Sequence, residues 1–325
     1  MKQTCKIGVN AFICLAVACC AMAGLLTANS SAGTSRIAGQ DDFGRQIVLE
    51  KPPERIVLLS GSPIDVIYEL GAGDLLVGVV DSIDTSYPDI CRRYPSVVEK
   101  ERVGRFSDPN IEKIIALDPD LIIPFASSET PGKYTAVFDK RGLPYAAFVS
   151  VENTAFGIAQ VKRLGRLLGR ENQAAALAHK IRTEVDALSR MISSKARNKP
   201  LVYYWWGARN GTYGANTAIN ELIELAGGIN IAGQFNTQYM ELSPEYVIAS
   251  DPDVIIVSFW KENQKDERIK ALKQRPGFSD IKAVKNNRIH TIDGHSFHTV
   301  VRFAEVIQTL AGYIHPELFD KAEHQ

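Results

Sequence analysis

Two histidines near the C-terminal end are the residues most suited to metal chemistry. His295 and His298 occur in GHSFHTVV, directly after RIHTID, which is predicted to form a strand. Imidazole nitrogens bind iron, nickel, zinc and cobalt, so His295 is a candidate contact to a metal or a metal chelate. An H-x-x-H pair is a weak signal by itself, because a loop histidine is usually just a polar loop residue.

Aromatic residues gather in YYWWGARNGTYG, at residues 203–214. If this segment begins as a strand, period-two alternation places Tyr203 and Trp205 on one face and Trp206 on the other. Trp206 ends the strand beside Gly207, so we expect it to form the wall of a flat ligand site, and we expect Trp205 to be core. The alternative is that both tryptophans are core residues.

Two glutamates occupy equivalent places in a repeated phrase. Residues 111–123 read IEKIIALDPDLII and residues 244–256 read PEYVIASDPDVII, which aligns Glu112 with Glu245. Each glutamate lies in the predicted first turn of a helix, where the helix dipole stabilises a carboxylate by about 0.3–1 kcal/mol. That stabilisation would explain one such glutamate, but a pair at matching positions indicates a shared function.

The elements that position these residues alternate between strands and helices. Apolar, β-branched runs such as RIVLLS and VIIVSFW predict buried strands, and segments of helical periodicity lie between them. This alternation predicts a mostly parallel sheet in each half of the chain. Residues 171–192 lack proline and glycine and carry one apolar stripe, which predicts a long helix. We therefore predict an α/β fold with two Rossmann-like βα lobes joined by a single long helix.

The N-terminal segment is predicted to be a leader followed by a tether. MKQTCK is basic, and a mostly apolar run follows from residue 7 to residue 28, as in a secretory signal peptide. Cleavage after Ala23, a lipid anchor at Cys19 and retention as a membrane anchor are the three alternatives. The predicted divisions are 1–23 as signal peptide, 24–53 as tether, 54–153 as N-terminal lobe, 154–197 as helical linker with its long helix at 171–192, and 198–325 as C-terminal lobe.

Composition and missing motifs exclude several functions. The chain has 37 basic and 37 acidic residues, so its net charge gives no support for nucleic-acid binding. Four of the five cysteines lie in the predicted leader, so a processed chain would keep only Cys91 and could form no internal disulfide. The motifs G-x-S-x-G, G-x-x-x-x-G-K-[ST] and H-E-x-x-H are absent from the sequence. We therefore do not expect an enzyme.

Together these features resemble the substrate-binding proteins of ABC importers for iron–siderophore complexes, cobalamin and haem. The resemblance covers residues 54–318 and rests on RIVLLSGSPIDVIYELGAGDLLVGVVD, the two glutamate-bearing phrases, AINELIELAGGINIAG and IHPELF. It implies that Glu112 and Glu245 dock onto arginines of an inner-membrane permease, which works with an ATPase. We expect a monomer in the periplasm or on the outer face of the cytoplasmic membrane.

The resemblance also implies a ligand between the lobes, at the carboxyl ends of the strands. We expect an iron–siderophore complex first, with cobalamin or haem as alternatives, so iron or cobalt would arrive with the ligand and the protein needs no cofactor of its own. Val300-Val301-Arg302 stands where the family has Gly-Pro-Arg, so the loop that carries His295 can differ in geometry. The predicted cleft residues are Ser60, Ser62, Phe106, Phe125, Ser127, Trp206, Arg209, Tyr213, Tyr239 and His295.

A chelate is expected rather than a free metal ion. In related two-lobed proteins a bare ion needs histidines and carboxylates from both lobes, yet all six histidines lie after residue 178. The identity of the chelate stays open at this point. The candidate contacts are Phe106, Phe125 and Trp206 as walls for cobalamin, Arg105 and Arg209 for an anionic siderophore, and Tyr213, Tyr239 or His295 as axial ligands of haem.

Overall fold

The computed structural model describes residues 36–124, 126–127, 130–207 and 209–319 of the chain. The predicted leader and Phe125 lie outside these ranges. None of the helices in the described part combines the length and the apolar character needed to cross a lipid bilayer. Two four-stranded parallel sheets, one in each half of the chain, organise these residues and confirm the predicted α/β class.

The sheet of the N-terminal lobe has the strand order β5-β4-β3-β8, and every pairing is parallel. Because the order reverses at β3, the carboxyl ends of β3 and β8 lie side by side at a topological switch point. The strands are β3 (Ile56–Leu58), β4 (Leu76–Val79), β5 (Glu101–Arg102) and β8 (Leu121–Ile123), with a small hairpin of β6 (Gly104–Arg105) and β7 (Asp108–Pro109). The helices are α1 (Ile64–Glu69), α2 (Ile83–Ser86), α3 (Pro88–Arg93), α4 (Ile111–Ala116) and α5 (Thr135–Arg141).

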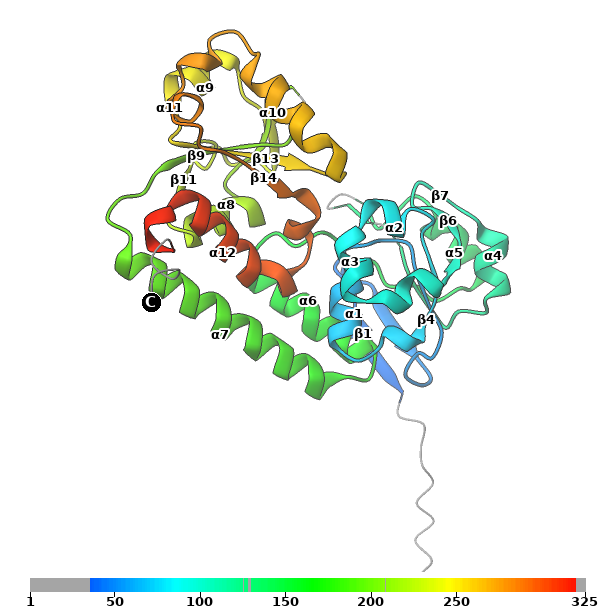
Figure 1. The fold of residues 1–325 in the computed structure, drawn as a ribbon. Helices are drawn as coiled ribbons and strands as arrows, with labels where there is room; N and C mark the ends of the chain where they lie inside the picture. Colours follow the sequence, from blue (N-terminus) through cyan, green and yellow to red (C-terminus); the bar gives the residue numbers. More distant parts are fainter. Residues whose placement is uncertain (1–35, 125, 128–129, 208, 320–325) are drawn as a thin grey trace, which may run out of the picture. The chain divides into compact units, whose positions relative to one another are not determined.

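The sheet of the C-terminal lobe has the order β11-β9-β13-β14, again with every pairing parallel. Its switch point lies between β9 and β13. Helices α9, α10 and α11 cover one face of this sheet, and α8 and α12 cover the other (Figure 1). The strands are β9 (Leu201–Trp205), β11 (Ile229–Asn230), β13 (Val254–Phe259) and β14 (Ile289–Asp293), beside a hairpin of β10 (Gly211–Tyr213) and β12 (Tyr239–Glu241). The helices are α8 (Ala218–Leu225), α9 (Pro244–Ser250), α10 (Lys265–Lys273), α11 (Lys282–Lys285) and α12 (Phe303–Ile314).

Two helices connect the lobes. They are α6 (Thr154–Leu167) and the 25-residue α7 (Glu171–Lys195), which packs against α6 and α12. Helix α7 begins at the predicted residue and extends three residues beyond the predicted end, so the long connecting helix is confirmed. Part of the predicted tether forms an antiparallel hairpin of β1 (Ile37–Gln40) and β2 (Gln46–Leu49), which packs on α6.

The repeated phrase forms the same structural unit in both lobes. Helix α4 is followed by Asp118 and helix α9 by Asp251, and both aspartates have the left-handed conformation, with φ of 46° and 44°. Two residues later, Asp120 accepts hydrogen bonds from two backbone amides just before β3, at 2.8 and 2.9 Å. Asp253 accepts one from the first residue of β9, at 2.8 Å. The phrase therefore fixes a helix–strand unit to the start of the first strand of each lobe.

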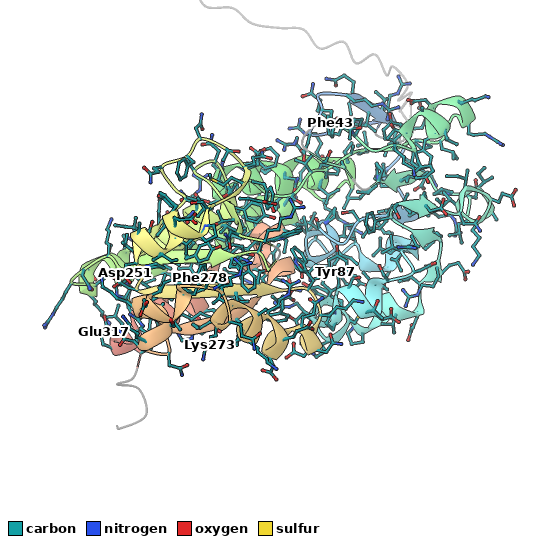
Figure 2. The ribbon with its side chains drawn as sticks, turned by 90° about the horizontal axis from the view of Figure 1, so that it is seen from above. Phe43, Tyr87, Asp251, Lys273, Phe278 and Glu317 are labelled. Carbon is teal, nitrogen blue, oxygen red and sulfur yellow. The ribbon has the colours of Figure 1, made fainter. Side chains whose placement is uncertain are left out.

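The alternation predicted for β9 is confirmed by the two cores that flank it. Tyr203 and Trp205 are buried with Phe278 beneath α9 to α11, whereas Tyr204 belongs to the main core on the other face. Figure 2 labels Phe278 inside the C-terminal lobe. Trp205 is 2% exposed, and its indole nitrogen donates to the carbonyl of Arg209 at 2.9 Å. Trp205 is therefore a core residue, as predicted.

Candidate functional site

A cavity of about 260 Å³ is lined by segments of both lobes. From the N-terminal side, Ala126 and Ser127 follow strand β8, and residues 149–152 lead into α6. From the C-terminal side, Tyr213 ends β10, and residues 216–219 lead into the first turn of α8. Because the carboxyl end of β8 opens into it, the cavity lies where open α/β sheets generally bind ligands.

A larger polar cavity of about 720 Å³ adjoins the first. The two share Glu152, Asn216, Thr217 and Gln238 in their linings. The larger one is dominated by amide and carboxylate side chains, whereas the smaller one has a mixed apolar and hydroxyl lining. The remaining lining residues of the larger cavity are Asn153, Ala215, Asn220, Glu221, Glu224, Asn236 and Thr237.

Aromatic rings lead from the end of β9 to the smaller cavity. The ring centroid of Trp206 lies 5.7 Å from that of Tyr239, in an edge-on contact. Tyr239 in turn lies 5.8 Å from Tyr213, which lines the cavity. Trp206 is partly buried, and its indole nitrogen has no hydrogen-bond partner within the part of the chain that the structure describes. The predicted residues Trp206, Tyr213 and Tyr239 are thus brought together, although only Tyr213 faces the cavity.

Trp260 is an aromatic residue of this cluster that sequence reasoning missed. It follows β13 directly, so it stands at the C-terminal switch point opposite Trp206, with their ring centroids 6.3 Å apart. Its ring also lies edge-on to His295 at 4.7 Å and to His298 at 5.6 Å. The run VIIVSFW gives the signal, because Trp260 follows its strand just as Trp206 follows β9.

His295 is fixed by an aspartate and lies at the interface of the lobes. Its Nδ1 is 2.9 Å from Oδ1 of Asp293, which also accepts a hydrogen bond from the His295 backbone amide at 3.0 Å. Burial raises the pKa of Asp293, but the hydrogen bonds from the His295 side chain and backbone outweigh burial, so the pKa of Asp293 lies below its ordinary value. The imidazole packs 4.4 Å from the ring of Tyr87, labelled in Figure 2, and faces a space of only about 10 Å³.

His298 lines both the smaller interlobe cavity and the space of about 10 Å³ beside His295. Its Nδ1 is 3.4 Å from the hydroxyl of Ser150. Burial, together with the neighbouring His295, lowers the pKa of His298 to about 4, so a neutral imidazole faces the cavity at pH 7. No group of three histidine, cysteine or carboxylate side chains that could hold a metal ion occurs among the described residues.

The serines and the phenylalanine predicted in the N-terminal lobe are distributed over several spaces. Ser60 is buried, and its hydroxyl lies 3.4 Å from the backbone amide nitrogen of Ser62. Ser62 lines the small space beside His295. Phe106 is 49% exposed and lines a separate cavity of about 260 Å³. Ser127 lines both the cavity beside Phe106 and the smaller interlobe cavity. It therefore connects Phe106 to the predicted cleft.

Arg209 is not brought to these cavities. Its side chain is 80% exposed and forms an ion pair with Glu241, with 3.3 Å between nitrogen and oxygen. The backbone of Arg209 has φ of 46°, a left-handed conformation in the turn before β10. Phe125, the other predicted wall residue, lies outside the described ranges.

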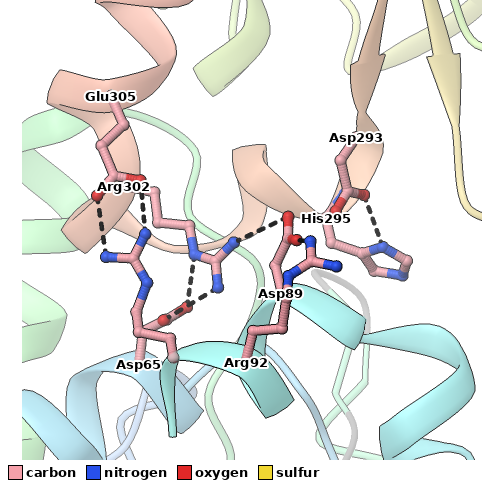
Figure 3. Close-up of polar contacts among 8 residues, drawn as sticks. Asp65, Asp89, Arg92, Asp293, His295, Arg302 and Glu305 are labelled. Carbon is pink, nitrogen blue, oxygen red and sulfur yellow. Dashed lines mark hydrogen bonds and ion pairs between the residues drawn. The ribbon is translucent and has the colours of Figure 1, made fainter. Parts of the chain in front are cut away.

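Ion pairs join the two lobes beside the cavities, and none of them was predicted from the sequence. Arg302, directly before α12, makes two bonds of 3.1 and 3.2 Å to Asp65 on α1, and both side chains are almost fully buried. Arg93 on α3 makes two bonds of 2.9 and 2.8 Å to Glu305 on α12. Figure 3 shows these contacts together with Asp89, whose carboxylate lies 3.9 Å from Arg302. We call this set of five residues the interlobe clamp.

The two repeated glutamates occupy matching environments. Glu112 lies in the first turn of α4, capped by Asn110, and Glu245 lies in the first turn of α9, capped by Ser243. Both glutamates are exposed, and neither forms an ion pair with another described residue. Each helix therefore presents an exposed carboxylate, as predicted.

Comparison with known proteins supports this description. The family model described as periplasmic binding protein matches residues 56–295. The cobalamin-binding protein of Halobacterium salinarum is 33% identical over 218 residues, which are 66% of this chain and 57% of that relative. The uncharacterized ABC transporter substrate-binding lipoprotein YvrC of Bacillus subtilis is 26% identical over 286 residues, 86% of either chain.

A solved structure extends the likeness to the whole fold. The apo form of the periplasmic heme-binding protein RhuT from Roseiflexus sp. RS-1 superposes with a TM-score of 0.68 and 26% identity. The superposition covers 82% of this chain and 99% of that structure. With the family model matching most of the chain, the molecule described here belongs to the periplasmic binding protein family.

Proposed function

We propose that this protein captures a metal chelate between its lobes and delivers it to an ABC permease. The observation that carries the proposal is a cavity lined by both lobes, at the carboxyl end of β8 and beside the aromatic residues that follow β9 and β13. The relatives support the same role, because one is named an ABC transporter substrate-binding lipoprotein and another a cobalamin-binding protein. No bond of the chelate is broken in this role, so the protein acts as a binder and not as an enzyme.

The proposed ligand brings its own metal coordination. Cobalamin is the first candidate, since the relative with 33% identity is named for it, and haem and iron–siderophore complexes are the alternatives. In this proposal Trp206, Trp260 and Tyr239 supply aromatic surface at the ends of the strands, and Tyr213 and Ser127 line the entrance. His295 would contact the chelate if the lobes separate enough to expose it.

The proposed partner is the permease of an ABC importer, outside the cytoplasmic membrane. Glu112 and Glu245 would dock onto arginines of that permease, because bidentate arginine–carboxylate pairs orient two surfaces well. Export through the predicted signal peptide, with a lipid anchor at Cys19 as the alternative, would bring the protein to this side of the membrane. We propose that it works there as a monomer.

Titration of the purified protein tests the chelate proposal. Cyanocobalamin, haemin and a ferric tris-catecholate complex would each be added while tryptophan fluorescence and calorimetric heat are followed. Saturable one-to-one binding of at least one chelate is the expected result. If none of the three chelates binds, the proposal is wrong, and binding of a free divalent ion instead would indicate a bare-ion binder.

A further inference from the structure

We propose that the cleft selects uncharged chelates over anionic ones, and that Glu152 is the residue that sets this preference. The inference rests on the proposed function, and it names the charge class of the ligand that the cleft takes. It is carried by the charges that line the two adjoining cavities and by the position of Glu152 between them.

The first observation concerns the charges around the cleft. The lining of the two cavities contains Glu152, Glu221 and Glu224 but no lysine or arginine, as far as the described residues go. No described lysine or arginine lies within ion-pair distance of these three carboxylates. A ligand that carries several negative charges would therefore enter against an uncompensated negative field, whereas a neutral ligand would not.

Three cationic side chains that could have offset this field are used elsewhere. Arg302 is committed to Asp65 in the interlobe clamp, and Arg209 forms its ion pair with Glu241 on the exposed surface. Lys133 lines the separate cavity beside Phe106. A cleft built for an anionic chelate would instead direct its arginines toward the ligand.

The polar groups that remain suit a ligand with carboxamide groups at its edge. Asn216, Asn236 and Gln238 can each donate and accept hydrogen bonds, and carboxylates such as Glu224 can accept from an amide NH₂ group. A neutral chelate whose periphery carries amides would find both kinds of partner here. An anionic oxygen could use only the donors and would be repelled by the carboxylates.

Glu152 is the carboxylate best placed to act on the ligand. Glu221 accepts bonds of 2.6 and 2.9 Å from the backbone amide and hydroxyl of Thr154, so it serves the start of α6. Glu152 instead lines both cavities and accepts a hydrogen bond from Gln238 at 3.1 Å. This bond joins the segment before α6 to the segment before β12, at the boundary of the two cavities. A ligand that fills both cavities must displace it and would then meet the carboxylate directly.

Charge variants of Glu152 test the inference. We would measure dissociation constants for cyanocobalamin, as the neutral chelate, and for a ferric tris-catecholate, as the trianionic one, on the wild type, Glu152→Gln and Glu152→Lys. Glu184→Lys is the matched control, because this substitution makes the same charge change at an exposed position of α7. The readout is the ratio of the two dissociation constants at low and at moderate salt, with circular dichroism to confirm folding.

The wild type is expected to prefer the neutral chelate. Glu152→Lys should shift the ratio toward the trianion by at least about tenfold at low salt, Glu152→Gln by less, and Glu184→Lys hardly at all. The inference is overturned if the wild type prefers the trianion, or if Glu152→Lys and Glu184→Lys shift the ratio equally. If the wild type binds neither these chelates nor haem, the proposed function itself fails and the charge preference falls with it.

Discussion

The guanidinium of Arg302 and the carboxylate of Asp65 form a buried, two-bond ion pair between residues 237 positions apart in the sequence. Arg302 precedes α12 in the C-terminal lobe, and Asp65 lies in α1 of the N-terminal lobe. The exposed fractions of their side chains are 5% and 1%. The pair therefore links the loop that carries His295 and His298 to the first helix of the other lobe.

Removing one partner of this pair should be costly. Arg302→Met leaves the Asp65 carboxylate buried without its cation, and we expect the free energy of unfolding to fall by about 3–5 kcal/mol. Urea denaturation followed by circular dichroism measures this loss. The double variant Asp65→Leu/Arg302→Met should recover most of it, because it leaves no unpaired buried charge.

The control for the clamp is a neighbouring arginine that stays within its own lobe. Arg92 pairs with Asp89 on the same helix, and its side chain is 74% exposed. Arg92→Met should change the free energy of unfolding by less than about 1 kcal/mol. A loss at Arg302→Met as small as that at Arg92→Met would show that the buried pair does not stabilise the fold.

Substitutions of the two adjacent tryptophans should have different effects, one on folding stability and the other on chelate affinity. Trp205 is buried with a bonded indole nitrogen and with the guanidinium of Arg275 over its ring, so Trp205→Ala should cost about 3–5 kcal/mol of stability. Trp206 is partly buried beside Tyr239, and Trp206→Ala should weaken chelate binding by about 1–3 kcal/mol. Thermal melts and calorimetric titration of both variants read the two effects. Unchanged chelate affinity in Trp206→Ala would show that other residues form the aromatic wall of the ligand site.

Periodicity predicts the main helices and the central strands of each sheet, but it predicts neither the two short hairpins β6–β7 and β10–β12 nor the long-range contacts. Strand alternation correctly separated Trp205 from Trp206, and the repeated phrase correctly predicted a shared helix–strand unit. The same rule that selected Trp206 would have selected Trp260, had it been applied to the strand that ends there. The clamp could not be predicted, because no local pattern indicates that Arg302 will meet Asp65. The position of Arg209 after a strand predicts a place in the cleft, yet its left-handed turn directs the side chain to Glu241 on the surface.

Removing the two proposed docking glutamates should impair delivery of the chelate to the permease without changing chelate binding. Glu112→Ala together with Glu245→Ala removes two exposed carboxylates outside the cavities, so chelate affinity should stay within about twofold, well below 1 kcal/mol. Uptake into vesicles that contain the cognate permease should fall sharply. The matched control is Glu184→Ala with Asp186→Ala, two exposed carboxylates on α7. Normal uptake by the first double variant would refute the docking assignment.

Stability should fall on mild acidification because of His298. Its pKa is about 4 in the folded protein, where burial disfavours the imidazolium, and about 6.5 in an unfolded chain. Between these values the unfolded chain binds more protons, so stability rises with pH and is lost as pH falls from about 6.5 to about 4. The loss from this one group is about 3 kcal/mol at most.

Chemical denaturation at several pH values tests the role of His298. The slope of the unfolding free energy against pH should flatten in His298→Gln over this window. His179→Gln, which removes an exposed histidine from α7, serves as the control and should keep the wild-type slope. An unchanged slope in His298→Gln would mean that another group governs the acid response.

Blocking the cavity tests the central proposal, capture of a chelate between the lobes, most directly. Ser150 is exposed and lines the cavity, so Ser150→Trp should fill it with little effect on the core. Ser193→Trp on the exposed face of α7 adds the same bulk away from the cavity. We predict that calorimetric titration with the chelate bound by the wild type gives no measurable heat for Ser150→Trp and wild-type affinity for Ser193→Trp. Wild-type affinity in a folded Ser150→Trp protein would contradict binding in the cavity between the lobes.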